Sequence, residues 1–113
     1  MTKVLFVARK RADLTEDQFL TYWRYVHAPI VTTVPGVRRY VVNATIANAV
    51  LTTALWDGIA EIWFDNPTAV QDAAVSSAGR RALADIRNFC APESRTLVVE
   101  EIEIMPFAAT SAG

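Results

Sequence analysis

Alternating apolar and polar positions mark four segments of the chain as β-strands. The segments are rich in β-branched and aromatic residues and span residues 3–9, 37–46, 59–64 and 96–104. In the third segment, Ala60, Ile62 and Phe64 share one face. Ile59 and Trp63 share the other face, which indicates a strand that is covered on both sides.

Apolar positions three or four residues apart predict a first helix over residues 16–28. Thr15 and Gln18 form a capping box at its start, with acidic residues in the first turn. Pro29 predicts the helix end, because the residue before a proline avoids helical geometry. The inward-facing stripe of this helix comprises Phe19, Trp23, Val26, His27 and Ile30.

A second helical region follows the third strand. Residues 65–67 are an acid, an amide and a proline, which is a strong signal for a helix start. We expect one helix over residues 68–76, a break that Gly79 permits, and a further helical piece over residues 80–89.

The order of these elements predicts an α+β fold of the ferredoxin-like type, β-α-β-β-α-β, over residues 1–107. Right-handed crossovers place both helices on one face of a four-stranded antiparallel sheet. The other face has no cover from its own chain, although it must carry Ile59 and Trp63. We therefore expect a homodimer in which two open sheet faces meet. Residues 108–113 are expected to form a disordered tail.

Composition narrows the classes of partner. The chain has 113 residues, with 11 basic and 12 acidic side chains and a net charge of -1, so neither nucleic acid nor an anionic membrane is an expected partner. Cys90 is the single cysteine, which excludes an intrachain disulfide and favours a reducing cytoplasm. One histidine and one cysteine far apart in sequence do not make a metal site.

The one histidine, His27, is the first candidate for chemistry, because imidazole changes charge near neutral pH and transfers protons. A second interpretation is a helix-end histidine that satisfies a backbone carbonyl. A third follows from its place at the predicted carboxyl end of the helix. There the helix dipole favours the charged ring, which would anchor a substrate carboxylate.

Tyr40 and Asp85 each have two open interpretations. The hydroxyl of Tyr40 either holds a carbonyl or phenolate oxygen beside His27 or bonds a backbone group in the core. Asp85 either hydrogen-bonds His27 and orients its ring, or pairs with Arg81 or a backbone amide.

Aromatic residues supply candidate walls for an apolar pocket. Trp23, one helical turn before His27, either packs in the core or lines such a pocket, and Phe6 and Phe89 are further ligand-contact candidates. Glu61 lies between Ile59 and Trp63 on the predicted dimer face, where a salt bridge is its simplest role.

Four motifs along the chain together resemble those of the EthD family, within the dimeric α+β barrel superfamily, over about residues 3–105. They are Phe19-x-x-x-Trp23-x-x-x-His27-Ala28-Pro29, Pro35-Gly36-x-x-x-Tyr40, the run from Asp57 to Phe64, and Asp85-x-x-x-Phe89.

The resemblance implies a ferredoxin-like fold, dimerisation through the open sheet faces and a pocket between sheet and helices. Similar families include a fuel-ether degradation protein, a muconolactone methylisomerase and polyketide-tailoring decarboxylases, and the resemblance implies no metal or organic cofactor. The methylisomerase type uses a histidine and a tyrosine at the positions of His27 and Tyr40. It also uses a cysteine that has no counterpart here, since Cys90 follows the last helix.

Three functional hypotheses follow. The first is a cofactor-independent enzyme for an apolar oxygenated molecule such as a lactone, a phenolic acid or a polyketide-like ring. His27 would move a proton and Tyr40 would hold an oxyanion during isomerisation, decarboxylation or dehydration. The second is a protein that binds a hydrophobic ligand for a partner oxygenase. The third has His27 as the axial ligand of a haem, because haem-binding proteins share the superfamily fold.

Overall fold

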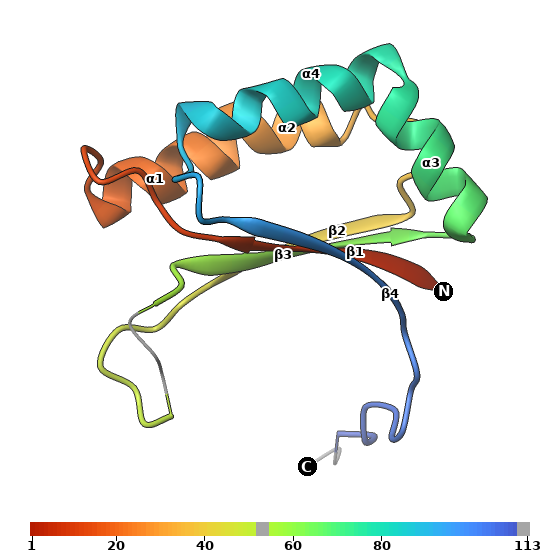
Figure 1. Cartoon of the computed structure of the whole chain (residues 1–113). Coiled ribbons are helices and arrows are strands. Elements are labelled where there is room, and N and C mark those ends of the chain that lie inside the picture. The colour runs from red at the N-terminus through yellow and green to blue at the C-terminus, as the bar shows by residue number, and fades with distance from the viewer. Residues whose placement is uncertain (52–54, 111–113) are drawn as a thin grey trace.

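A four-stranded antiparallel sheet with helices packed on one face forms the molecule (Figure 1). The structure is a computed structural model that describes residues 1–51 and 55–110. It confirms the predicted α+β ferredoxin-like fold. The strands β1 (Thr2–Ala8), β2 (Arg39–Ala44), β3 (Gly58–Phe64) and β4 (Arg95–Glu100) lie in the order β2-β3-β1-β4.

The last strand, β4, is shorter than the predicted 96–104. It lies at the sheet edge and pairs only with β1, where Glu100 lies opposite Thr2. One further backbone bond, from the Glu101 amide to the Met1 carbonyl at 3.0 Å, follows this last pair. The predicted tail over residues 108–113 reaches outside the described residues, which end at 110.

The first helical region begins where the capping box predicts. The Thr15 hydroxyl accepts from the Gln18 amide at 3.1 Å, and the Gln18 side chain accepts from the Thr15 amide at 2.9 Å. The region then comprises α1 (Glu16–Tyr22), the π-helical turn η1 (Trp23–His27) and α2 (Ala28–Val31).

The prediction that this helix ends at residue 28 is wrong, since it continues to Val31. The Ala28 amide donates to the carbonyl of Trp23, five residues back, instead of four. This wider turn accommodates Pro29, which has no amide hydrogen to donate and would clash with the carbonyl four residues before it. His27 therefore lies inside a continuous helical unit rather than at its carboxyl end.

The second helical region comprises α3 (Pro67–Val75), α4 (Ser77–Asp85) and the 3-10 turn η2 (Ile86–Asn88). The predicted break at Gly79 is wrong, because the break falls at Ser76, whose hydroxyl caps α4 by accepting from the Gly79 amide at 3.0 Å. Gly79 has another role. A Cβ atom there would lie 1.8 Å from the Ala73 carbonyl oxygen, so only glycine allows α3 and α4 to meet this closely.

The core lies between the sheet and the helices. Phe19 and Trp23 are almost fully buried and pack edge-on at 5.3 Å between ring centroids. Gly58 on β3 lets the Trp23 ring approach the sheet, since a Cβ atom there would lie 2.8 Å from it. The buried cluster consists of Phe6, Ala8, Phe19, Trp23, Ala60, Phe89 and Cys90.

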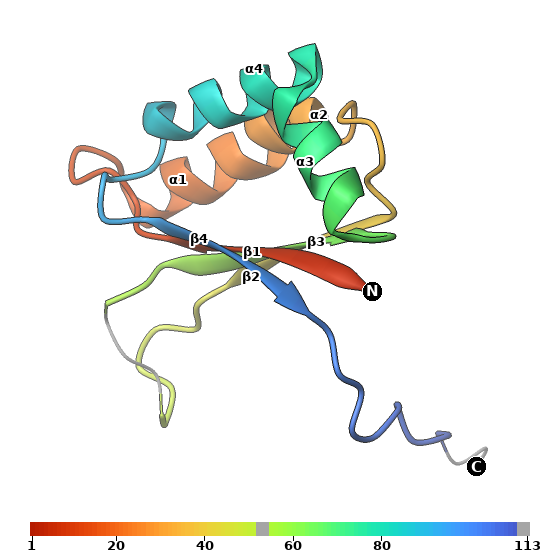
Figure 2. The same cartoon turned by 45° about the vertical axis from the view of Figure 1, so that its right-hand side comes forward.

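The opposite sheet face has no helix over it. Residues 45–51, which follow β2, and residues 101–110, which follow β4, both project from this side (Figures 1 and 2). Ile59 and Leu97 are 39% and 48% exposed there. Trp63 is largely covered by its own chain, because Lys3 and Arg39 lie 4.9 and 4.7 Å from its ring centroid. Within the described residues, no helix has the length and hydropathy to cross a membrane.

Candidate functional site

The helices enclose a cavity of about 270 Å³ against the sheet. This volume is about twice that of an engineered cavity of ~150 Å³ that binds benzene in another protein, so a molecule of one or two rings fits. The lining is almost wholly apolar, and its polar groups are those of His27, Tyr40, Trp23 and Thr96. Among the described residues, no Asp, Glu, Lys or Arg lines the cavity.

His27 lines this cavity and is buried, with 5% of its surface exposed. The π-helical turn η1 carries it, and such turns occur frequently at functional sites. Its Nδ1 lies 2.8 Å from Oδ2 of Asp85 on α4, and its ring packs on Phe89 at 4.8 Å between centroids. Of the two arrangements predicted for Asp85, the structure has the contact with His27.

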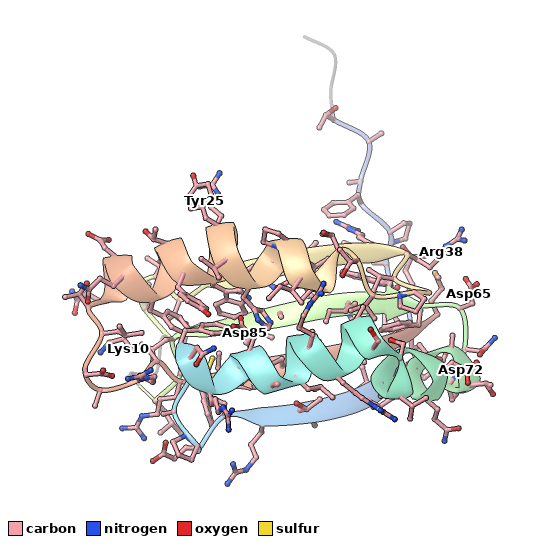
Figure 3. The ribbon with its side chains drawn as sticks, turned by 90° about the horizontal axis from the view of Figure 1, so that it is seen from above. Lys10, Tyr25, Arg38, Asp65, Asp72 and Asp85 are labelled. Atoms are coloured by element: carbon pink, nitrogen blue, oxygen red, sulfur yellow. The ribbon has the colours of Figure 1, made fainter. Side chains whose placement is uncertain are left out.

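The side chain of Asp85 points from α4 toward α1 and accepts two further hydrogen bonds (Figure 3). The Tyr22 hydroxyl donates to Oδ1 at 2.6 Å, and the Asn88 amide donates to the same oxygen at 2.9 Å. Burial alone would raise the pKa of Asp85, but the hydrogen bonds from Tyr22, Asn88 and His27 outweigh it and lower the pKa. The carboxyl group is therefore ionised at neutral pH.

Burial lowers the pKa of His27, although the hydrogen bond and charge of Asp85 act in the opposite direction. The ring is therefore neutral at neutral pH. Because the ionised carboxylate only accepts, Nδ1 carries the proton and donates it to Asp85. Nε2 then keeps a lone pair, and in the described part of the chain nothing hydrogen-bonds it. The prediction that a helix dipole favours charged His27 is wrong.

Tyr40 contributes the second polar group of the cavity. Its hydroxyl oxygen accepts from the indole nitrogen of Trp23 at 2.9 Å, so this partner is a side chain and not the backbone group of the second interpretation. Burial raises the pKa of Tyr40 to about 12, which keeps the phenol protonated. Its own proton has no acceptor among the described residues, so the hydroxyl is free to donate toward a ligand.

The remaining predicted ligand contacts divide into two groups. Phe6 and Trp23 line the cavity. Phe89 and Asp85 do not line the cavity, and both contact the His27 ring, Phe89 by packing and Asp85 by a hydrogen bond. Tyr22 and Asn88 were not predicted. Asn88 had a signal, because it lies one turn after Asp85 on the same side, whereas the contact of Tyr22 joins residues 63 positions apart.

The cavity opens between the helices α3 and α4 on one side and the edge strand β4 on the other. Leu83 and Val98 line it and are 54% and 56% exposed, and Thr96 and Ala74 also combine lining with exposure. We call these four residues the mouth. The mouth lies on the β4 side of α4. Asp85 contacts His27 on the other side of α4, which faces α1.

Cys90 does not line the cavity, and burial raises its pKa to about 12, so it is an unreactive thiol. In the described residues, no group of three His, Cys, Asp or Glu side chains is placed to hold a metal ion. The haem hypothesis does not fit, because about 270 Å³ is below the roughly 300–1,000 Å³ of pockets for drug-sized ligands and haem is larger than such ligands.

Comparison with known proteins identifies the family of the chain and solved structures with a similar fold. A model of the EthD domain matches residues 11–93, which confirms the resemblance seen in the sequence. No curated protein matches the chain.

Three solved structures illustrate the shared fold. An EthD-family protein from Bacillus halodurans is 20% identical, with a TM-score of 0.79 over 90% of this chain and 99% of its own. The hydroxynitrile lyase of Passiflora edulis is 14% identical, with a TM-score of 0.72 over 93% and 96%. A dimeric ferredoxin-like protein of unknown function from Thermobifida fusca is 16% identical, with a TM-score of 0.63 over 87% and 88%.

Proposed function

Because the chain belongs to the EthD family, we propose that it is a small enzyme that acts without a cofactor on an apolar oxygenated molecule, by proton transfer through His27. One observation carries the proposal. A neutral imidazole donates Nδ1–H to an ionised aspartate and presents an unpaired Nε2 to an apolar cavity. That is the arrangement of a general base.

The proposed reaction begins when Nε2 of His27 removes a proton from the bound molecule. The imidazolium that forms is stabilised by the carboxylate of Asp85 at 2.8 Å, in surroundings that exclude water. The electron pair left on the substrate moves onto its oxygen, and the Tyr40 hydroxyl donates to that oxyanion. His27 then returns the proton to another atom, which gives isomerisation, or to a leaving group, which gives elimination.

A lyase or isomerase is the class that this apparatus supports best. A hydroxynitrile lyase is among the proteins with a similar fold, which is an example of a lyase on this architecture. Neither the reaction nor the substrate transfers at 14% identity, so the proposal rests on the geometry of His27, Asp85 and Tyr40.

Exchange of carbon-bound hydrogen tests proton transfer without knowledge of the natural substrate. We expect the protein to accelerate deuterium incorporation at the acidic carbons of 2-tetralone, a two-ring ketone, in D₂O. The His27→Gln variant should lose about 100-fold or more of this rate. Tyr25→Phe is the matched control, because Tyr25 is 66% exposed and points away from the cavity (Figure 3). Equal rates for wild type and His27→Gln would reject proton transfer.

A second candidate function is the binding of a hydrophobic ligand for a partner oxygenase. The observation that favours it is the apolar lining, which needs no chemistry to hold a ring. In that case His27→Gln should leave the affinity for 2-tetralone within about twofold and wild type should show no exchange. The buried contact between His27 and Asp85 favours the enzyme, since binding alone requires no oriented base.

The active form that we propose is a homodimer through the open sheet face. Structures with the same fold include proteins described as dimeric. In this chain the face exposes Ile59 and Leu97, and two projecting segments lie beside it (Figure 2). Light scattering should give twice the chain mass of 12.5 kDa, and a value near 12.5 kDa would contradict the dimer.

A further inference from the structure

The cavity separates an uncharged interior from a mouth at the protein surface. In the described residues no charged side chain lines it, and its exposed lining lies on α3, α4 and β4. An ionised group on a ligand would be costly inside, because an unpaired charge loses its hydration there. A permanent charge on a bound molecule therefore remains at the mouth, whereas the oxyanion of the proposed reaction forms only transiently, beside the Tyr40 hydroxyl.

Helical geometry places two arginines beside this mouth. At about 100° per residue, Asp85 lies on the flank of α4 that faces η1, whereas Arg80 lies on the flank of Leu83. Arg87 lies in the 3-10 turn η2, where about 120° per residue places it on the same side of the helix as Arg80. Arg80 precedes Leu83 by three residues and Arg87 follows it by four. Figure 3 shows α4 running between α1 and β4, so the flank opposite Asp85 faces the β4 side.

Both arginines are exposed and available to a ligand. In the part of the chain that the structure describes, no acidic group forms an ion pair with Arg80 or Arg87. Glu100, the acid at the far end of β4, accepts from the Thr2 hydroxyl at 3.0 Å and pairs with the amino terminus at 3.5 Å. The mouth therefore carries positive charge beside apolar Leu83 and Val98.

We propose that the substrate is an amphipathic carboxylic acid, whose ring fills the cavity and whose carboxylate binds Arg80 and Arg87 at the mouth. The proposal rests on the proposed function, because it names the substrate class of the same cavity. A guanidinium offers paired donors that match the two oxygens of a carboxylate. The oxygenated end of the ring then points inward, toward His27 and Tyr40.

Two probes that differ by one carboxylate test this assignment. They are 6-hydroxy-2-naphthoate and 2-naphthol, which share the ring and the hydroxyl group. We expect the wild type to bind the naphthoate at least as tightly as the naphthol in calorimetric titrations. The double variant Arg80→Gln/Arg87→Gln should weaken the naphthoate by about 10-fold, because two exposed ion pairs each contribute modestly, and leave the naphthol within about twofold.

Arg81→Gln is the matched control, because Arg81 is an exposed arginine on the other flank of α4, and it should change neither affinity. The assignment is overturned if the double variant leaves naphthoate binding unchanged or weakens both probes equally, or if wild type binds neither. These results are independent of hydrogen exchange. If His27→Gln leaves hydrogen exchange unchanged, the proposed reaction is rejected and the assignment of the mouth stands. If the double variant leaves naphthoate binding unchanged, the assignment of the mouth is rejected and the proposed reaction stands.

Discussion

At the scale of single residues, His27 is governed by two opposing effects. Burial favours the neutral ring, and the carboxylate of Asp85 favours the charged one. Burial prevails, so the ring is neutral at rest and becomes charged only when it takes a proton. The neighbouring carboxylate then stabilises the charge. A base of this kind is ready at neutral pH without a prior deprotonation step.

The lowered pKa of His27 predicts how stability depends on pH. The unfolded chain takes up a proton on His27 below about 6.5, while the folded protein resists it. Stability is therefore fully present above about 6.5 and falls as the pH decreases through the folded pKa. Urea unfolding of wild type and His27→Gln at several pH values should show a steeper loss below 6.5 in wild type. Parallel curves would contradict the lowered pKa.

The substitution Asp85→Asn tests whether Asp85 positions the base. An amide can donate as well as accept, so it no longer fixes the proton on Nδ1. We expect deuterium exchange into 2-tetralone to slow by about 100-fold or more. The ¹⁵N spectrum of His27 should change from one tautomer to a mixture, which a purely structural role would not produce. Asp72→Asn is the control, because Asp72 is exposed and points away from the body (Figure 3).

At the scale of elements, the junction of α3 and α4 depends on one missing side chain. A Cβ atom at Gly79 would lie 1.8 Å from the Ala73 carbonyl oxygen. Gly79→Ala should therefore lower the free energy of unfolding by about 1–3 kcal/mol through overpacking. Helix propensity alone predicts the opposite sign, a gain of about 1 kcal/mol. Chemical denaturation measures whether the free energy of unfolding falls or rises. Ala84→Gly, on the exposed side of α4, measures the effect of helix propensity alone.

Elements whose signals are local could be predicted from the sequence. The capping box at Thr15 and the cap before Pro67 involve neighbours within three residues, and both form as expected. The break at Ser76 could not be predicted, because it depends on the close approach of Gly79 to the Ala73 carbonyl group. The π-helical turn that carries His27 could not be predicted either, because it depends on a backbone hydrogen bond that spans five residues instead of four.

The site shows the same division. His27, Tyr40, Trp23 and Phe6 were predicted, and the fold places all four at one cavity. The contact between Tyr22 and Asp85 joins residues 63 positions apart, and nothing in the local sequence indicates it. The mouth between α4 and β4 also depends on how far α4 lies from the sheet edge, which is a property of the assembled layers.

At the scale of the whole molecule, the two faces of the sheet have different roles. The helix-covered face holds the cavity, and the open face carries Ile59 and Leu97 beside a polar group of side chains. Lys3 joins that group by binding Glu61 at 3.1 Å and Glu101 at 3.2 Å. Glu61 thus has a partner within its own chain, on β1, where an interface salt bridge was expected. The apolar part of this face is the part that remains for a second copy.

The homodimer predicts a specific effect of charge on that apolar part. Ile59→Asp/Leu97→Asp places two carboxylates where the faces of two copies would meet, and each loses hydration without gaining a partner. We expect light scattering to show a shift from twice 12.5 kDa toward 12.5 kDa, with far-ultraviolet circular dichroism unchanged. Val75→Asp is the matched control, since Val75 is 64% exposed on α3, and it should leave the mass unchanged.

Because the cavity lies within one subunit on the other face, the monomeric variant should still bind 2-naphthol. Loss of binding in a folded monomer would show instead that the second copy completes the site, and an unchanged mass would place the dimer interface elsewhere.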